Sequence, residues 1–129
     1  MDQESSNVEG TALETVIIFT GRMEELARFY QEGLELGGFS RSPRHLGLQV
    51  GPVYLGFDQV EEVRGGGGVT LWFTVDDLKG TYERLVLMGA GVVYPPSRKA
   101  WGAYLAAVYD PDGNMIGLSQ RGGVHGESE

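Results

Sequence analysis

The chain has 129 residues, 41% hydrophobic and 22% charged, which is typical of one globular domain with a core of its own. Its net charge of −8 disfavours nucleic-acid binding, which depends on clustered lysine and arginine, and its lack of cysteine excludes disulfides and thiolate chemistry. Residues 1–10 are polar and no apolar run is long enough to cross a bilayer, so we expect a cytoplasmic protein that does not bind membranes.

The first half of the chain, residues 14–64, predicts a module with the order β-α-β-β-β. Thr15–Thr20 is rich in β-branched and aromatic residues, which favours a strand. Residues 23–36 place apolar side chains at helical spacing, and we expect Gly37-Gly38 to end that helix. Three strands with a Gly-Pro turn between the last two are expected next, at residues 39–41, His45–Val50 and Val53–Gln59.

The second half, residues 65–120, repeats this order after a glycine run at residues 65–68 that we interpret as a flexible linker. A strand at residues 69–75 leads into a helix that an aspartate would cap and that extends to residue 88. The halves correspond at an offset of about 55 residues near their first strands, which indicates an internal repeat. Three strands complete the module, at residues 92–94, Tyr104–Tyr109 and Met115–Gln120.

Two such modules predict an α+β fold. Each sheet would bury one face under its helix, and pairing the modules would curl the strands into a mixed sheet with a concave ligand cleft and the helices outside. We expect a single domain at residues 14–120, with loose ends at residues 1–13 and 121–129.

The most specific motif begins at Trp101-Gly102 and continues through an apolar strand to Asp110-Pro-Asp-Gly-Asn and the closing strand. Proline fixes φ in this turn, while glycine and asparagine tolerate left-handed conformations. The stretch resembles the second half of the vicinal oxygen chelate superfamily, which includes glyoxalase I, the extradiol dioxygenases and the bleomycin-resistance proteins. The resemblance covers most of residues 14–120 and implies the α+β fold described above and a homodimer.

Metal-dependent members of that superfamily bind a metal through the first and closing strands of each module. The resemblance places Thr15, Gly56, Thr70 and Gly117 at these positions. Glycine offers no side chain and a neutral threonine hydroxyl is a poor ligand, so we expect neither a metal nor another cofactor. We expect His45, one of two histidines, at the surface or the rim of the cleft.

Strand alternation predicts which residues line the cleft. Glycine in place of a metal ligand would leave room for a planar group, and Trp72 and Tyr54 offer flat surfaces for stacking. Asp58 and the negative charge of the chain would favour a cationic ligand. The predicted ligand-binding residues are Tyr54, Gly56, Asp58, Trp72, Trp101, Met115 and Gly117.

The sequence therefore favours a metal-independent protein that sequesters a planar or aromatic small molecule, similar to the bleomycin-resistance proteins. The main alternative is a glyoxalase- or dioxygenase-like metalloenzyme with non-standard ligands, since a fold does not establish a reaction. A third is a regulatory subunit whose cleft receives a segment of a partner.

Overall fold

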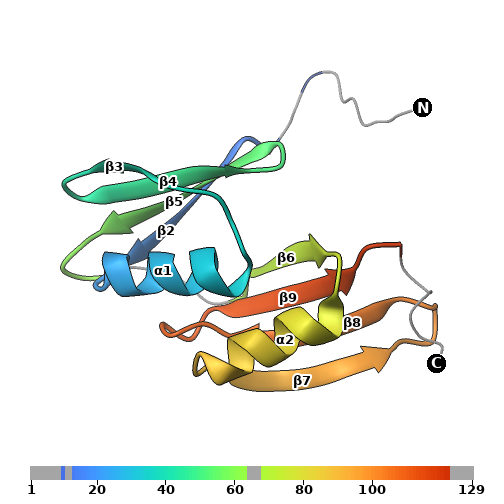
Figure 1. Ribbon diagram of the computed structural model, residues 1–129. Helices are drawn as coiled ribbons and strands as arrows, with labels where there is room; N and C mark the ends of the chain where they lie inside the picture. The colour runs from blue at the N-terminus through green and yellow to red at the C-terminus, as the bar shows by residue number, and fades with distance from the viewer. Residues whose placement is uncertain (1–9, 11–12, 64–67, 123–129) are drawn as a thin grey trace.

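The computed structural model describes residue 10 and residues 13–63 and 68–122 (Figure 1). The predicted linker at residues 65–68 falls outside this part of the chain except for Gly68, as do the predicted loose ends except for Gly10, Leu13 and residues 121–122. The chain folds into two modules of the order βαβββ, which confirms the predicted α+β fold.

Module one forms a four-stranded sheet in the order β2-β5-β4-β3, in which β2 runs parallel to β5 and the other pairs are antiparallel. Its elements are β2 (Thr15–Thr20), α1 (Met23–Gly33), β3 (Ser40–Ser42), β4 (His45–Val50) and β5 (Val53–Gln59).

Module two repeats this arrangement as a sheet in the order β6-β9-β8-β7, with β6 parallel to β9. Its elements are β6 (Thr70–Val75), α2 (Leu78–Leu87), β7 (Gly91–Arg98), β8 (Tyr104–Tyr109) and β9 (Met115–Gln120). Neither helix in the described part of the chain has the length and apolar character needed to span a membrane.

The bounds of β3, β6 and α2 differ from the sequence prediction by one residue, and those of α1 and β7 differ more. α1 ends at Gly33 rather than at Gly37-Gly38, and Glu35 then takes a left-handed φ of 57°. A side chain at Gly33 would collide with Leu85 of α2, since its Cβ would lie 2.3 Å from Leu85 Cδ2. β7 is longer than predicted and includes two prolines, which its position at the edge of the sheet and its irregular pairing with β8 accommodate.

A glutamine at the end of each module's last strand holds the start of that module's helix. Gln59 Oε1 accepts a hydrogen bond from the Met23 N–H, and Gln120 Oε1 accepts one from the Leu78 N–H, each at 2.9 Å. Helix starts carry backbone donors without partners in the helix, so the same side chain meets the same need twice. This confirms that the chain is an internal repeat.

The two modules share one hydrophobic core. Both helices lie on the same side of the molecule, each against its own sheet, so the opposite faces of the sheets are turned away from them (Figure 1). Arg84 Nε of α2 donates to the Gly33 carbonyl of α1 at 3.0 Å. The buried side chains of the core are Met23, Leu26, Ala27, Phe29, Tyr30, Leu46, Leu48, Leu55, Phe57, Leu78, Leu85, Ala106, Val108, Ile116 and Leu118.

The turn between β8 and β9 fastens module two to module one. The buried Tyr30 hydroxyl of α1 donates to Asp110 Oδ2 at 2.7 Å. Next to it, the Thr20 hydroxyl donates to Asp112 at 2.6 Å, and Arg22 forms an ion pair with Asp112 at 3.0 Å. The motif that looked like a simple hairpin turn in the sequence therefore also bridges the modules.

Candidate functional site

Each sheet has one face against its helix and one face turned away from it, and we call the second the outer face. These outer faces are the ones that the sequence analysis assigned to the ligand cleft, and they carry the predicted ligand-binding residues of the strands. Alternation along β5 directs Leu55 and Phe57 into the core, so Tyr54, Gly56 and Asp58 lie on the outer face of module one. On module two the same reasoning places Trp72 of β6 on the outer face, with Met115 and Gly117 of β9.

On module one, Tyr54 and Asp58 are joined by His45. His45 and Asp58 are cross-strand partners on β4 and β5, and His45 Nδ1 contacts the Asp58 carboxylate. The other ring nitrogen, Nε2, lies 2.6 Å from the Tyr54 hydroxyl. The His45 and Tyr54 rings are nearly parallel, with an angle of 16° between their planes. The three polar groups thus form one continuous hydrogen-bonded chain.

Glycines beneath these rings make this arrangement possible. A Cβ at Gly47 would lie 1.8 Å from the Tyr54 hydroxyl oxygen, and a Cβ at Gly56 would lie 2.7 Å from both His45 Cε1 and Ile17 Cδ1. Real side chains do not approach so closely, so both positions need glycine for the rings to lie flat on the sheet. The sequence analysis assigned the space above Gly56 to a planar ligand. In the structure the side chains of His45, Ile17 and Tyr54 occupy that space.

Module two repeats the arrangement of a ring lying over a glycine, with a tryptophan as the ring. Trp72 pairs with Gly117 across β6 and β9, and a Cβ at Gly117 would lie 2.3 Å from the indole ring. The indole lies over the glycine and remains 50% exposed. Gly117 therefore supports Trp72, and the exposed surface of the indole is what a ligand on this face would meet.

The remaining two predicted residues lie apart from these clusters. Trp101 is 75% exposed in the segment between β7 and β8. Met115 begins β9 and lines a groove of about 220 Å³ between the modules, to which Phe19 also contributes.

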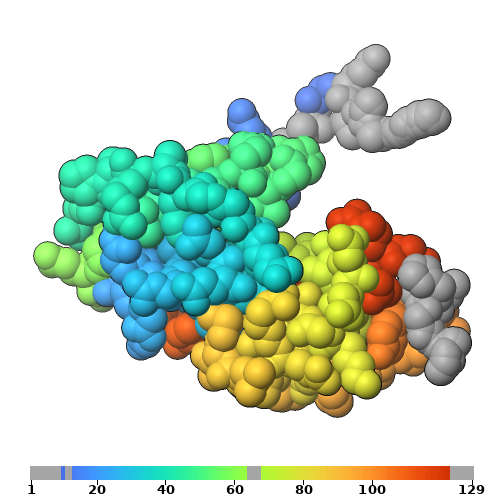
Figure 2. All heavy atoms as spheres, in the orientation of Figure 1, coloured from blue at the N-terminus to red at the C-terminus, as the bar shows by residue number. Residues whose placement is uncertain are grey.

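The edge strands β2 and β6 border a larger hollow of about 550 Å³ between the modules. It is mainly apolar, and Trp72 and Leu71 of β6 line it opposite Val16 of β2 and the Gly51-Pro52 turn. Figure 2 shows this hollow between the green end of module one and the yellow and red parts of module two. Trp72 therefore belongs both to an outer face and to the main apolar hollow.

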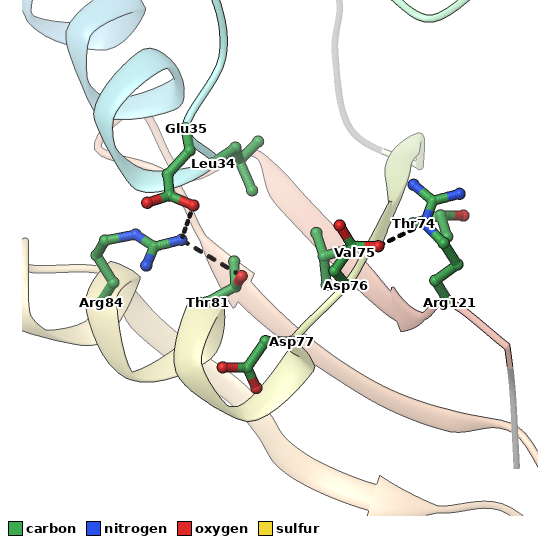
Figure 3. Close-up of a pocket in the computed structure, with 9 residues that line it drawn as sticks. All are labelled: Leu34, Glu35, Thr74, Val75, Asp76, Asp77, Thr81, Arg84 and Arg121. Atoms are coloured by element: carbon green, nitrogen blue, oxygen red, sulfur yellow. Dashed lines mark hydrogen bonds and ion pairs between the residues drawn. The ribbon is translucent and has the colours of Figure 1, made fainter. Parts of the chain in front are cut away.

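A third groove, of about 340 Å³, lies on the helix side of the molecule and is polar (Figure 3). Arg84 bridges Glu35 at 3.6 Å and Thr81 at 3.4 Å, while Arg121 pairs with Asp76 at 2.7 Å. Both arginines that line the groove are thus engaged by neighbouring side chains, which makes the groove a less suitable anion site than its charges suggest.

The four positions at which the resemblance would place metal ligands do not fit a metal. Gly56 and Gly117 contribute no donor, and neighbouring rings fill the space above them. Thr15 and Thr70 lie on different sheets and offer neutral hydroxyls. Within residues 13–63 and 68–122, no three histidine, aspartate or glutamate side chains gather as metal ligands would.

Sequence reasoning underestimated His45. It expected a surface or rim residue and did not foresee that the imidazole, 30% exposed, would lie between Tyr54 and Asp58 and contact both. The signal was present in the hairpin. A two-residue turn at Gly51-Pro52 makes Val50 pair with Val53, and counting back along both strands sets His45 opposite Asp58.

A sequence model described as the Glyoxalase/Bleomycin resistance protein/Dioxygenase superfamily matches residues 12–118. No protein of curated function is similar enough to match the chain.

Solved structures share the fold. A glyoxalase-related enzyme from Fulvimarina pelagi is 24% identical with a TM-score of 0.75, covering 86% of this chain and 88% of its own. A glyoxalase/bleomycin resistance protein/dioxygenase family enzyme from Burkholderia phytofirmans PsJN is 24% identical with a TM-score of 0.74, at 85% and 98% coverage. TioX from Micromonospora sp. ML1 is 20% identical with a TM-score of 0.69, at 85% and 98% coverage.

Proposed function

Because the chain belongs to the glyoxalase/bleomycin resistance protein/dioxygenase superfamily, we propose that it binds a planar or aromatic small molecule without a metal, as a sequestering protein of the bleomycin-resistance type. The observation that carries this proposal is the half-exposed indole of Trp72, which lies flat over Gly117 at the edge of the main apolar hollow. A flat aromatic surface held in place by the strand beneath it is suited to stacking.

Trp72, Tyr54 and Met115 are the proposed ligand contacts on the strands, with Trp101 at the margin. Gly56 and Gly117 act indirectly, by seating the rings above them. Asp58 is engaged by His45, so a preference for a cationic ligand rests mainly on the net charge of −8.

We further propose that the protein is a cytoplasmic homodimer. The outer faces expose large apolar side chains on both modules, including Phe19 at 51% and Trp72 at 50%. A second copy placed against these faces would cover that surface and enclose a ligand between two sheets. Light scattering at micromolar concentration tests this assembly, and a purely monomeric protein would contradict it.

A thermal-shift experiment on metal-stripped protein tests the binding function. Bleomycin-type and other planar cationic compounds are compared with divalent metals, because a ligand that binds only the folded state raises its melting temperature. At a concentration of 100 times Kd the stabilisation amounts to about 2.7 kcal/mol. We expect an aromatic compound to stabilise the wild-type protein without metal.

Two variants make the result specific. Trp72→Ala should lose most of the ligand-induced shift, whereas Leu87→Ala, which removes an exposed apolar side chain from α2 on the helix side, should keep it. Stabilisation by a divalent metal alone, with stoichiometric metal in the purified protein, would contradict the proposal and restore the metalloenzyme.

A further inference from the structure

The outer face of module one carries a hydrogen-bonded chain that ligand stacking does not require. The Asp58 carboxylate can only accept, so His45 Nδ1 is the donor in this contact, and in a neutral imidazole it is the one protonated nitrogen. Nε2 then accepts, and the Tyr54 hydroxyl donates to it across 2.6 Å. With the imidazole neutral, the direction of both hydrogen bonds follows from the carboxylate.

This order matches the general pattern of an activated hydroxyl. A hydroxyl group becomes more reactive when it forms a hydrogen bond to a histidine and a third group holds that histidine in position. Because the Tyr54 proton points at His45, the lone pairs of the phenol oxygen are available to accept a proton from a bound molecule.

The surroundings of His45 support this use. Asp58 contacts it on β5, while the neighbouring outer-face residues are uncharged: Ile17 and Phe19 on β2, and Ser42 on β3 opposite His45. An imidazolium formed here would be balanced by the Asp58 carboxylate, and the apolar side chains of β2 would contact the hydrocarbon part of a ligand.

We propose that Tyr54, His45 and Asp58 form a proton-accepting relay, and that this face receives a ligand with an acidic hydroxyl, of the phenol or enol class. The ligand O–H bond breaks as its proton passes to the Tyr54 oxygen. The original Tyr54 proton passes to His45 Nε2, and the ligand keeps the electron pair as an oxyanion. This deepens the proposed binding function, on which it rests, by naming the chemistry of the ligand.

The test uses N-acetylimidazole, which acetylates phenol oxygens, on the full chain without any ligand. Peptide mass spectrometry follows Tyr54 and, as an internal reference, Tyr109, which is 40% exposed on the outer face of module two. We expect Tyr54 to react about tenfold faster than Tyr109, because His45 removes its proton as the oxygen attacks.

Two variants separate a relay from a purely structural contact. Asp58→Asn keeps the shape of the side chain, but its amide can donate to Nδ1 and so reverse the imidazole tautomer, which should abolish the Tyr54 advantage. Gln49→Ala changes an exposed residue of β4 on the same face and should preserve it. Circular dichroism melting curves establish that each variant is folded, and His45→Gln provides a second route to the same loss.

If Tyr54 reacts no faster than Tyr109, or keeps its advantage in a folded Asp58→Asn variant, the relay is overturned. Such a result leaves the proposed binding function standing, because that function is tested separately by ligand-induced stabilisation and Trp72→Ala.

Discussion

On the outer face of module one, His45 and Asp58 stand opposite each other on β4 and β5, whereas the same register of module two holds Leu105 and Ser119. Beside the glycine of each closing strand, module one has Ile17 and module two has Trp72. One face therefore carries a polar hydrogen-bonded chain, and the other carries an exposed indole.

The inner architecture, in contrast, is nearly the same in both modules. Strand order, the parallel pair and the glutamine that holds the helix start all recur. The difference teaches that the repeat preserves what the core needs and varies what the surface presents. A ligand bound across both faces would be stacked by one module and hydrogen-bonded by the other.

The largest expected effect concerns the contact between the modules. Asp110→Ala removes the acceptor for the buried Tyr30 hydroxyl and for the N–H groups of Asp112 and Asn114. We expect a loss of about 3 kcal/mol in the free energy of unfolding, since a buried donor is left without a partner. Urea unfolding measures it. Asp112→Ala, whose partners are more exposed, should cost less, and equal losses would contradict the bridging role.

The next effect separates the two outer-face glycines. Gly117→Val forces a rigid indole to move and should destabilise the protein by about 2 kcal/mol. Gly56→Val meets the ends of the His45 and Ile17 side chains and should cost about 1 kcal/mol. Thermal melting of both variants compares them. A neutral Gly117→Val would mean that Trp72 does not rest on the sheet.

Alkaline pH provides a second test of the buried hydrogen bond between Tyr30 and Asp110. Burial, followed by the charges of Asp110 and Asp112, raises the pKa of Tyr30 above its ordinary value. The unfolded chain loses this proton near pH 10 while the folded chain keeps it, so stability is full below pH 10 and falls above it, by about 1.4 kcal/mol at pH 11. The stability of Tyr30→Phe should fall correspondingly less steeply between pH 9 and pH 11. Parallel curves would contradict this.

The smallest expected effect tests whether the two helix starts are stabilised equally by their glutamines. Gln59→Ala and Gln120→Ala each remove the acceptor for one helix start and should each cost about 1 kcal/mol. Chemical denaturation of both variants provides the comparison. Clearly unequal losses would show that the two hydrogen bonds, although alike in geometry, contribute different amounts to the free energy of unfolding.

The fold was predictable because its signals are local. β2, β4, β5, β8 and β9 were predicted at their observed bounds, since β-branched strands and turn residues mark them in the sequence. The end of α1 was predicted too late, because the chain leaves the helix after Gly33 and Glu35 takes a left-handed φ of 57° before the more conspicuous glycine pair is reached. β7 was too short because proline breaks interior strands but is tolerated at an edge.

The candidate site was predictable as a set of faces but not as a set of contacts. Alternation placed Tyr54 and Asp58 on one face, and Trp72 and Gly117 on another. It could not show that rings of the chain itself fill the space above the glycines, because side-chain rotamers decide that. The pairing of His45 with Asp58 could have been inferred from the hairpin register, which requires only the turn length.

The two tryptophans of the chain occupy very different surroundings, and this gives the protein an optical reporter of its own. Trp72 rests on the strand below it, whereas Trp101 is largely surrounded by water. A Trp101→Phe variant would carry a single fluorescent indole, and that indole lies on the outer face of module two. Its emission wavelength would then follow, in real time and without any label, the arrival and departure of whatever covers that face.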